Sequence, residues 1–270
     1  MTKVIVTGGA GQLGQAFSSL ALKEVVALDR QQLDISKANS IRQAIQLYQP
    51  TVVINAAAYT NVEQAELEPE QAFSINEKSA ALLAQICAEQ GIQLIHLSTD
   101  YVFDGEKGQP YEPLDQTNPI NCYGQSKLAG EKAVLLANSQ VILVRSSWLY
   151  SEFGNNFQTK ILQAAKDKSQ LGEALRVVSD EWGTPTYAPD LVTFLLLLAQ
   201  KAKAYQGQIL HFSSNQVMSR LQMAEMLLTA ALQRQELKEL PKVEAALAKD
   251  YPTVAKRPRN SALRSSELRG

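Results

Sequence analysis

Short apolar runs alternate with longer segments of helical character through the first 150 residues of the chain. The runs occupy positions 3–7, 25–28, 52–54, 94–97 and 141–144. Their β-branched residues predict strands, whereas segments such as 40–48 and 62–90 predict helices. Regular alternation of strands and helices is typical of a parallel sheet with crossover helices. We therefore predict an α/β fold with a Rossmann-type doubly wound parallel sheet.

The pattern loosens beyond residue 150, where helices, strands and turns follow one another less regularly. An apolar helix over 190–202 and a last strand over 209–212 are expected to return to the sheet. We predict two packed lobes: an NAD(P)-binding domain (1–150 with 187–213) and a smaller substrate-binding lobe (151–186 with 214–270). The basic stretch 256–260 is interpreted as a solvated tail, with contact to a ligand phosphate as the alternative.

Three glycines spaced three apart, Gly8, Gly11 and Gly14, separate the first strand from a helix-compatible segment. A dinucleotide site needs a tight turn, a backbone without Cβ where a pyrophosphate approaches, and helix amides that meet the anion. Because the strand, turn and helix follow in the required order, we predict such a site. A turn that binds no nucleotide is the alternative.

The next two strand ends carry further candidates for the same site. The second strand ends at Asp29 and Arg30, where an acid suits a ribose diol and an arginine tolerates a 2′-phosphate. A surface acid–base pair is the alternative interpretation. Ala56, Ala57 and Ala58 follow the third strand. Such small residues allow a planar ring or sugar to lie close to the backbone, or else serve tight helix–strand packing.

The fourth strand leads into the polar cluster Ser98 to Tyr101, and Tyr123 and Lys127 follow on one face of a predicted helix. Reduction of a carbonyl requires a hydride and a proton for the developing alkoxide. A phenol has a pKa of about 10, and a nearby ammonium is expected to lower that pKa toward the working range. We predict that Thr99 holds the carbonyl oxygen, Tyr123 transfers the proton and Lys127 tunes it.

Other polar residues are assigned structural roles. His96 and His211 lie in apolar strands without metal-ligating neighbours, so we predict core histidines. Cys122 is interpreted as a bystander thiol. Asn76 is expected either to brace the site or to lie on a helix surface. The following acidic residues are interpreted as a solvated helix face: Glu63, Glu66, Glu68 and Glu70.

Composition excludes several classes of function. The net charge is −1, which argues against nucleic acid as a partner. Apolar residues make up 45% of the 270 positions, yet no run reaches the roughly 18 residues of a membrane span, so no membrane partner is expected. Two cysteines give no disulfide framework, which favours a reducing, cytoplasmic setting.

The sequence resembles the extended short-chain dehydrogenase/reductase family. The blocks that carry the resemblance extend over nearly the whole chain: TGGAGQLG (7–14), NAAAYTNVEQAE (55–66), STDYVFDG (98–105), YGQSKLAGE (123–131), RSSWLY (145–150), GNNF (154–157), WGTPT (182–186) and RPRNSAL (257–263). STDYVFDG followed by YGxxKLxGE resembles one subgroup. That subgroup reduces the 4-keto group of dTDP-4-dehydro-β-L-rhamnose with NADPH or NADH, giving dTDP-β-L-rhamnose.

The resemblance also implies roles for individual residues. Thr99, Tyr123 and Lys127 match the family's catalytic triad. Together with Arg30, which is assigned from its own chemistry, the cofactor-binding positions are Gly8, Gly11, Gln12, Leu13, Asp29, Asp34, Ile35, Ala56, Ala57, Ala58, Tyr59, Tyr123 and Lys127. The candidate substrate-binding positions are Thr99, Asp100, Tyr101, Val102, Phe103, Trp148 and Asn156.

The chain departs from the family at two points. It stops soon after RPRNSALRSSEL, where relatives usually add a helical tail. Some relatives bind Mg²⁺ at a dimer interface through an acidic residue just after the glycine turn, where this chain has Gln15-Ala16-Phe17. We therefore expect no metal site, and a homodimer remains possible. Two further alternatives are a non-catalytic regulatory subunit of a methionine adenosyltransferase and another sugar-nucleotide reductase or epimerase of the same fold.

Overall fold

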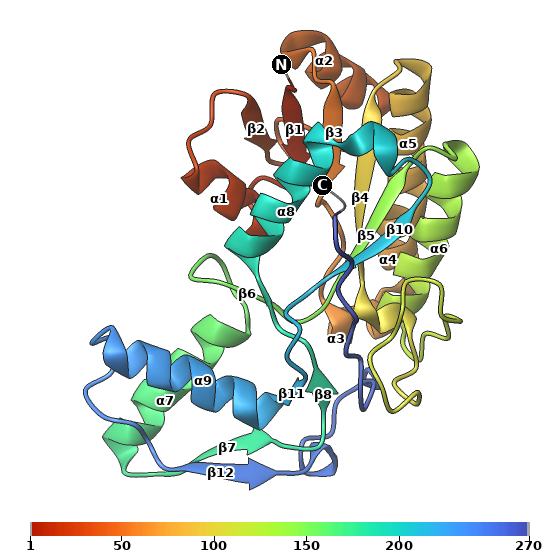
Figure 1. The fold of residues 1–270 in the computed structure, drawn as a ribbon. Coiled ribbons are helices and arrows are strands. Elements are labelled where there is room, and N and C mark those ends of the chain that lie inside the picture. The colour runs from red at the N-terminus through yellow and green to blue at the C-terminus, as the bar shows by residue number, and fades with distance from the viewer. Residues whose placement is uncertain (1, 269–270) are drawn as a thin grey trace.

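A six-stranded, fully parallel sheet forms the centre of the larger lobe in the computed structural model, which describes residues 2–268 (Figure 1). Its strands, in spatial order, are β10 (Ile209–Phe212), β5 (Ile142–Ser146), β4 (Gln93–Thr99), β3 (Val52–Asn55), β1 (Val4–Thr7) and β2 (Val25–Leu28). The order reverses direction between β1 and β3, and a crevice at such a switch point is where ligands bind to open α/β sheets. The predicted Rossmann-type sheet is confirmed.

Helices cover both faces of this sheet because successive strand residues point to opposite sides. One face packs against α1 (Gln12–Ser19) and α8 (Ala188–Gln200), and Ile95 belongs to that cluster. The other face packs against α2 (Ala38–Tyr48), α5 (Ala80–Glu89) and α6 (Cys122–Ala137), and Leu94 belongs to that cluster. Both leucine-sized side chains are fully buried, and each such burial stabilises the fold by about 1.5–3 kcal/mol.

The predicted helical region 62–90 is confirmed but is broken into four pieces. These are α3 (Val62–Leu67), α4 (Pro69–Phe73), the π-helical turn η1 (Ser74–Ser79) and α5. The π-turn turns Asn76 inward, where its Oδ1 accepts a hydrogen bond from the Tyr59 amide and its Nδ2 donates one to Ser126 Oγ at 2.9 Å. Of its two predicted roles, Asn76 therefore has the bracing one, since it ties α6 to the loop after β3.

The prediction of a solvated acidic face on these helices is wrong for three of its four members. Glu63 accepts hydrogen bonds from two backbone amides of the C-terminal segment and pairs with Arg257 at 3.0 Å. Glu66 accepts a hydrogen bond from the Cys122 amide at 2.7 Å, at the start of α6. Glu68 accepts one from a tyrosine hydroxyl at 3.0 Å. A backbone amide at the start of a helix requires an acceptor, and Glu66 supplies one, whereas Glu63 and Glu68 bind groups outside helix ends.

The smaller lobe consists of two helices packed on a two-stranded parallel ladder (Figure 1, lower left). Its elements are α7 (Phe157–Leu171), β7 (Leu175–Val178), α9 (Arg220–Gln233) and β12 (Val243–Ala246). Asn156 and Ser219 begin the two helices, each in a capping box that satisfies the free backbone amides. The strand over 209–212 is therefore not the last one; β12 escaped prediction because Val-Glu-Ala-Ala has little strand propensity.

Short β-pairs join the lobes. β8 (Trp182–Gly183) pairs antiparallel with β11 (Met218–Ser219), and β6 (Leu149–Tyr150) pairs parallel with β9 (Thr186–Tyr187). Single-turn 3₁₀ helices complete the element list: η2 (Asp100–Val102), η3 (Ala202–Ala204) and η4 (Ala248–Asp250). Within the described residues, no helix is both long enough and apolar enough to cross a membrane.

The basic stretch 256–260 is not the solvated tail that we predicted. Its last residue, Asn260, forms a β-bridge with Trp182; the chain beyond it forms a β-bridge from Leu263 to Tyr111 and then runs beside β10. The Ser266 amide donates to a β10 carbonyl at 2.8 Å. These backbone partners lie far away in the sequence, so no local pattern announces them. Residue 1 and residues 269–270 of the predicted lobe ranges lie outside the described residues.

Candidate active site

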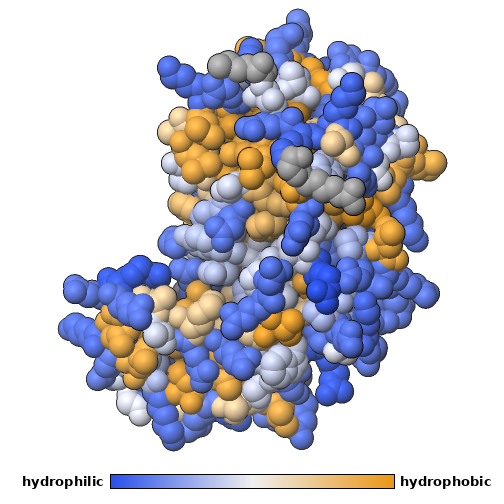
Figure 2. Space-filling view, in the orientation of Figure 1, coloured by the Kyte–Doolittle hydropathy of each residue, from blue (hydrophilic) through white to orange (hydrophobic). Residues whose placement is uncertain are grey.

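A cleft of about 1210 Å³ lies between the two lobes, at the carboxyl ends of the parallel strands. The outline of the molecule narrows between the lobes in the space-filling view (Figure 2). The lining of the cleft comes from both lobes and includes Gly8, Gly11, Gln12, Leu13, Arg30, Asp34, Ile35, Ala56, Ala57, Ala58, Thr60, Thr99, Asp100, Tyr101, Tyr123, Lys127, Ser146, Trp148, Asn155, Asn156, Arg176, Arg220, Tyr251 and Arg257. Most sequence-predicted site residues therefore meet in one cavity.

The glycine turn between β1 and α1 has the geometry that a diphosphate requires. Gly8 has a φ of +72°, which L side chains rarely adopt. A Cβ at Gly14 would lie 2.5 Å from the Gly8 carbonyl oxygen. Gly11 is the N-cap of α1, and no side chain among the described residues caps it, so the first helix amides point to the cleft unpaired. The turn thus fits a dinucleotide.

A fourth glycine of this turn was missed by sequence reasoning. A Cβ at Gly9 would lie 2.7 Å from the Leu28 carbonyl carbon, so β2 packs directly on the turn. The pair Gly8-Gly9 in the sequence is the signal that was available for it.

The residues after β2 divide into two groups. Arg30, Asp34 and Ile35 line the cleft, with the Arg30 side chain 75% exposed. A hydrogen bond from Ser36 keeps the pKa of Asp34 below its usual value. Asp29 instead accepts hydrogen bonds from two backbone amides of the following turn and is not among the lining residues. Arg30 therefore brings a positive charge to this edge of the cleft, in a loose pair with Asp34 at 4.0 Å.

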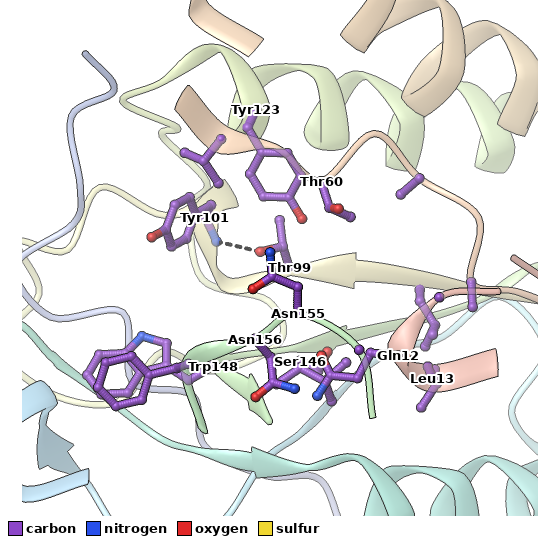
Figure 3. Close-up of a pocket in the computed structure, with 18 of the residues that line it drawn as sticks. Gln12, Leu13, Thr60, Thr99, Tyr101, Tyr123, Ser146, Trp148, Asn155 and Asn156 are labelled. Carbon is purple, nitrogen blue, oxygen red and sulfur yellow. Dashed lines mark hydrogen bonds between the residues drawn. The ribbon is translucent and has the colours of Figure 1, made fainter. Parts of the chain in front are cut away.

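The alanines after β3 lie against the glycine turn. A Cβ at Gly8 would lie 3.1 Å from the Ala56 backbone, so the two loops are in contact. Tyr59 turns away from the cleft, because its hydroxyl donates to Glu68 at 3.0 Å. Thr60, which the sequence did not single out, lines the cleft in its place and lies near the Tyr123 hydroxyl (Figure 3).

The structure brings together Thr99, Tyr123 and Lys127, the three residues of the predicted catalytic group. Thr99 ends β4, whereas Tyr123 and Lys127 lie one turn apart on α6. The Tyr123 hydroxyl points toward Thr99 (Figure 3). Lys127 Nζ donates a hydrogen bond to the Leu97 carbonyl at 2.7 Å, which holds the amine beside the strand end. All three side chains face the same part of the cleft.

The electrostatics of this group differ from the sequence-based expectation. Burial raises the pKa of Tyr123 above its ordinary value, and a hydrogen bond with Thr99 only partly opposes it. Burial also lowers the pKa of Lys127 to about 8, opposed by the charge of Glu131. The predicted lowering of the Tyr123 pKa by Lys127 is therefore absent, because burial and the charge of Asp100 both raise this pKa. The phenol keeps its proton, which suits a proton donor.

The STDYVFDG segment divides at the 3₁₀ turn η2. Asp100 and Tyr101 line the cleft, and burial raises the pKa of Asp100 to about 6. Val102 and Phe103 are fully buried on the far side of the turn, where the Phe103 ring stacks on Tyr111 with centroids 4.1 Å apart. The turn rotates these two side chains into a small core cluster, so they lie outside the cleft lining.

Two predicted sugar-side residues line the lower wall of the cleft (Figure 3). Trp148 has a φ of +45° and its ring lies under the Arg220 guanidinium, 3.5 Å from carbon to centroid. Asn156 caps α7, and its Nδ2 donates to two loop carbonyls at 2.8 and 2.9 Å. The Asn156 side-chain amide is thus held by the loop, whereas the side chain of Asn155, labelled beside Thr99, is exposed. Arg220 was missed because nothing in its local sequence links it to Trp148.

The two histidines and Cys122 lie outside the lining of the cleft. His96 and His211 are buried, as expected for core histidines; His96 Nδ1 accepts a hydrogen bond from Asn55 at 3.0 Å, whereas its buried Nε2 has no partner among residues 2–268. Burial raises the pKa of the Cys122 thiol, which keeps it protonated and unreactive. Residues 2–268 contain no group of three or more histidine, cysteine or acidic side chains suited to hold a metal ion.

The chain is similar along its length to proteins of one family. The family model described as RmlD substrate binding domain matches residues 1–270. A dTDP-4-dehydrorhamnose reductase from Aggregatibacter actinomycetemcomitans is 38% identical over 97% of this chain and 90% of the relative. A dTDP-4-keto-6-deoxy-D-glucose reductase from Streptomyces niveus is 42% identical over 73% of this chain and 68% of the relative.

The same family appears among solved structures. A crystal structure of dTDP-4-dehydrorhamnose reductase from Bacillus anthracis in complex with NADP superposes with a TM-score of 0.89 at 31% identity. The superposition covers 98% of this chain and 92% of that chain. Together with the glycine turn and the Thr99, Tyr123 and Lys127 geometry, these matches establish that the chain belongs to the RmlD substrate-binding-domain family of extended short-chain dehydrogenases/reductases.

Proposed function

We propose that the protein is an NADPH- or NADH-dependent oxidoreductase that reduces the 4-keto group of dTDP-4-dehydro-β-L-rhamnose to give dTDP-β-L-rhamnose. The observation that carries this proposal is the position of the Tyr123 hydroxyl. It points at Thr99 in the same cleft whose other end is the glycine turn. A proton donor and a dinucleotide turn in one cavity are what carbonyl reduction requires.

The residues present fit a nicotinamide dinucleotide. The open amides of α1 and the glycine turn would hold its diphosphate, and Arg30 a 2′-phosphate. The alanines after β3 would leave room for its adenosine half, and Lys127 would hold the nicotinamide ribose. When bound, this cofactor supplies the hydride that is added to the carbonyl carbon.

The chain's own residues control the proton. Thr99 would hydrogen-bond the keto oxygen and place it within reach of the Tyr123 hydroxyl. Because burial keeps the pKa of Tyr123 high, the phenol carries its proton until an alkoxide, a stronger base, develops beside it. Lys127, positively charged below a pKa of about 8, would stabilise the phenolate that remains.

A steady-state assay with the purified protein tests this function. NADPH absorbance should fall on addition of dTDP-4-dehydro-β-L-rhamnose, and dTDP-β-L-rhamnose should accumulate in equal amount. Unchanged absorbance with tightly retained cofactor would instead indicate an epimerase. Absence of turnover together with co-purification of a methionine adenosyltransferase would indicate the regulatory subunit.

The similarity to a dTDP-4-keto-6-deoxy-D-glucose reductase makes that sugar nucleotide the second candidate substrate. The two compounds share the dTDP group and the 4-keto group, and they differ in sugar stereochemistry. The two values of kcat/KM, measured side by side, decide between them. We expect the rhamnose precursor to have the higher value, because relatives named for it cover more of the chain.

Two finer properties remain proposals. We place the protein in the cytoplasm, since its two thiols, Cys87 and Cys122, are free and buried, as in proteins of reducing compartments. Fractionation of cells that express the chain tests this. We also propose a homodimer without bridging Mg²⁺, because Gln15 stands where some relatives have an acid. Light scattering with and without a chelator tests this: a dimer that dissociates on chelation would contradict it.

A further inference from the structure

The Trp148 ring is held in the cleft wall by contacts with the smaller lobe. The residue has a φ of +45°, a conformation that a non-glycine residue keeps only when its surroundings impose it. A Cβ at Gly183 would lie 2.3 Å from Trp148 Cε2, so the ring edge rests on the β8 backbone. The Arg220 guanidinium covers the ring face at 3.5 Å. The ring position therefore depends on Gly183 and Arg220.

The same local structure fixes both of these neighbours. The β8–β11 ladder pairs Gly183 with Met218, and α9 begins two residues later with Arg220. The Arg220 amide donates to the Glu181 carbonyl at 3.2 Å, and its Nε lies 3.7 Å from a Glu181 carboxylate oxygen. The capped start of α9 makes this anchor rigid. Arg220 thus reaches Trp148 from a defined backbone position.

The Arg220 guanidinium retains unused hydrogen-bonding capacity toward the cleft. Its face is occupied by Trp148 and its Nε by Glu181, whereas no described residue accepts a hydrogen bond from its terminal nitrogens. Arg257 lines the same cleft, and its buried Nε has no partner among residues 2–268. The two positive charges act on one another through space; Glu181 and Asp100 face Arg220, and Glu63 and Glu181 face Arg257. This part of the cleft is suited to an anion.

A planar guanidinium can stack on an aromatic ring with its face and bind a phosphate with its edge at the same time. We propose that Arg220 uses both surfaces: its edge binds the diphosphate of the sugar nucleotide, and its face fixes the Trp148 ring against the sugar. The proposal rests on the function proposed above. It makes the diphosphate a contributor to turnover as well as to affinity, because binding at the edge restrains the group that holds the ring.

Tryptophan fluorescence tests this coupling in the full chain. The protein has two tryptophans, so Trp182→Phe leaves Trp148 as the sole reporter. dTDP is titrated in the presence of saturating NADP, which keeps the probe out of the cofactor site. The variants are Arg220→Met, which keeps the unbranched apolar stem without the charge, and Arg220→Lys, which keeps the charge without the plane. Arg234→Met, at the exposed far end of α9, is the matched control.

We expect Arg220→Met to bind dTDP about tenfold to a hundredfold more weakly, as for loss of a charge-assisted hydrogen bond. Its Trp148 emission and acrylamide quenching should no longer respond to dTDP. With the keto-sugar substrate, KM should rise and kcat should fall. Arg220→Lys should regain part of the affinity but none of the emission response. NADP affinity should be unchanged in every variant, and Arg234→Met should match its parent.

Unchanged dTDP affinity in Arg220→Met would overturn the proposal. Weaker affinity with an intact Trp148 response would equally overturn it, since the coupling would then be absent. If Arg220→Met fails to bind NADP, Arg220→Lys decides the matter, and an emission response like that of the parent contradicts the proposal. The proposed function is tested separately: it would be contradicted by absence of turnover in the unmodified chain, and the titrations do not measure turnover.

Discussion

The two lobes supply their functional groups to the cleft in different ways. In the larger lobe the groups follow directly from strand ends and a helix N-terminus, as with Thr99 after β4 and the glycine turn before α1. In the smaller lobe they depend on tertiary contacts, as with Arg220 stacked on Trp148. We infer that the larger lobe performs the chemistry, and that the smaller lobe positions the substrate. Substitutions in the two lobes should therefore affect different kinetic constants.

The largest effect is expected from Lys127→Met in the larger lobe. Loss of the ammonium removes stabilisation of the Tyr123 phenolate, and general acid–base groups contribute about 10²–10⁴-fold to rate. kcat/KM for reduction should fall by that range, while dTDP affinity stays unchanged. Lys132→Met, exposed on the same helix, is the control. Weakened dTDP binding in the Lys127 variant would contradict the inference that only the smaller lobe positions the substrate.

A pH dependence follows from the same residue. Burial lowers the pKa of Lys127 to about 8, so its charge is present below that pH and is lost above it. kcat/KM should therefore be level below pH 8 and should then decline about tenfold per pH unit. The pKa of Tyr123 is raised by burial, so the phenol adds no second limb in this window. A profile that stays level to pH 10 would show that the ammonium is not required.

Gly183→Ala tests the smaller lobe. The added methyl group would lie 2.3 Å from Trp148 Cε2, so the ring must move. KM for the sugar nucleotide should rise on the order of tenfold, and KM for NADPH should not change. Gly172→Ala is the matched control, because its φ of +66° gives a comparable stability loss far from the ring. Equal KM values in both variants would show that the Trp148 position is unimportant.

The smallest effect is expected at Arg30. Its side chain is 75% exposed, so solvent screens its interaction with a 2′-phosphate. Arg30→Gln should raise KM for NADPH about threefold to tenfold and leave KM for NADH unchanged. Lys37→Gln, also exposed but outside the cleft lining, should change neither. Equal changes for both cofactors would show that Arg30 does not recognise the 2′-phosphate.

The same contrast between the lobes explains how much the sequence revealed. Periodicity and glycine spacing predicted the sheet, most of its helices and the turn before α1, because these depend on neighbours in the sequence. The residues assigned to cofactor and proton transfer came largely from motifs at strand ends. Asp29 and Tyr59 match such motifs, yet the structure gives each a local hydrogen bond away from the cleft.

The features that could not be predicted from the sequence depend on contacts between distant segments. Glu63 binds amides about 190 positions away, and the segment around Ser266 runs beside β10, so neither has a local signature. Arg220 meets Trp148 only after β8 and β11 pair. The pKa of Tyr123 is raised because its side chain is buried. The Tyr-x-x-x-Lys spacing in the sequence does not indicate that burial, so the direction of the shift could not be predicted.

Single-turnover reduction by Tyr123→Phe tests the central claim most directly. The substitution removes only the hydroxyl that points toward Thr99, so affinities for NADPH and dTDP should remain those of the unmodified chain. With both ligands saturating, the rate of product formation should fall by about 10²–10⁴-fold. A rate within threefold of the unmodified chain, with both ligands bound, would contradict the assignment of Tyr123 as the proton donor.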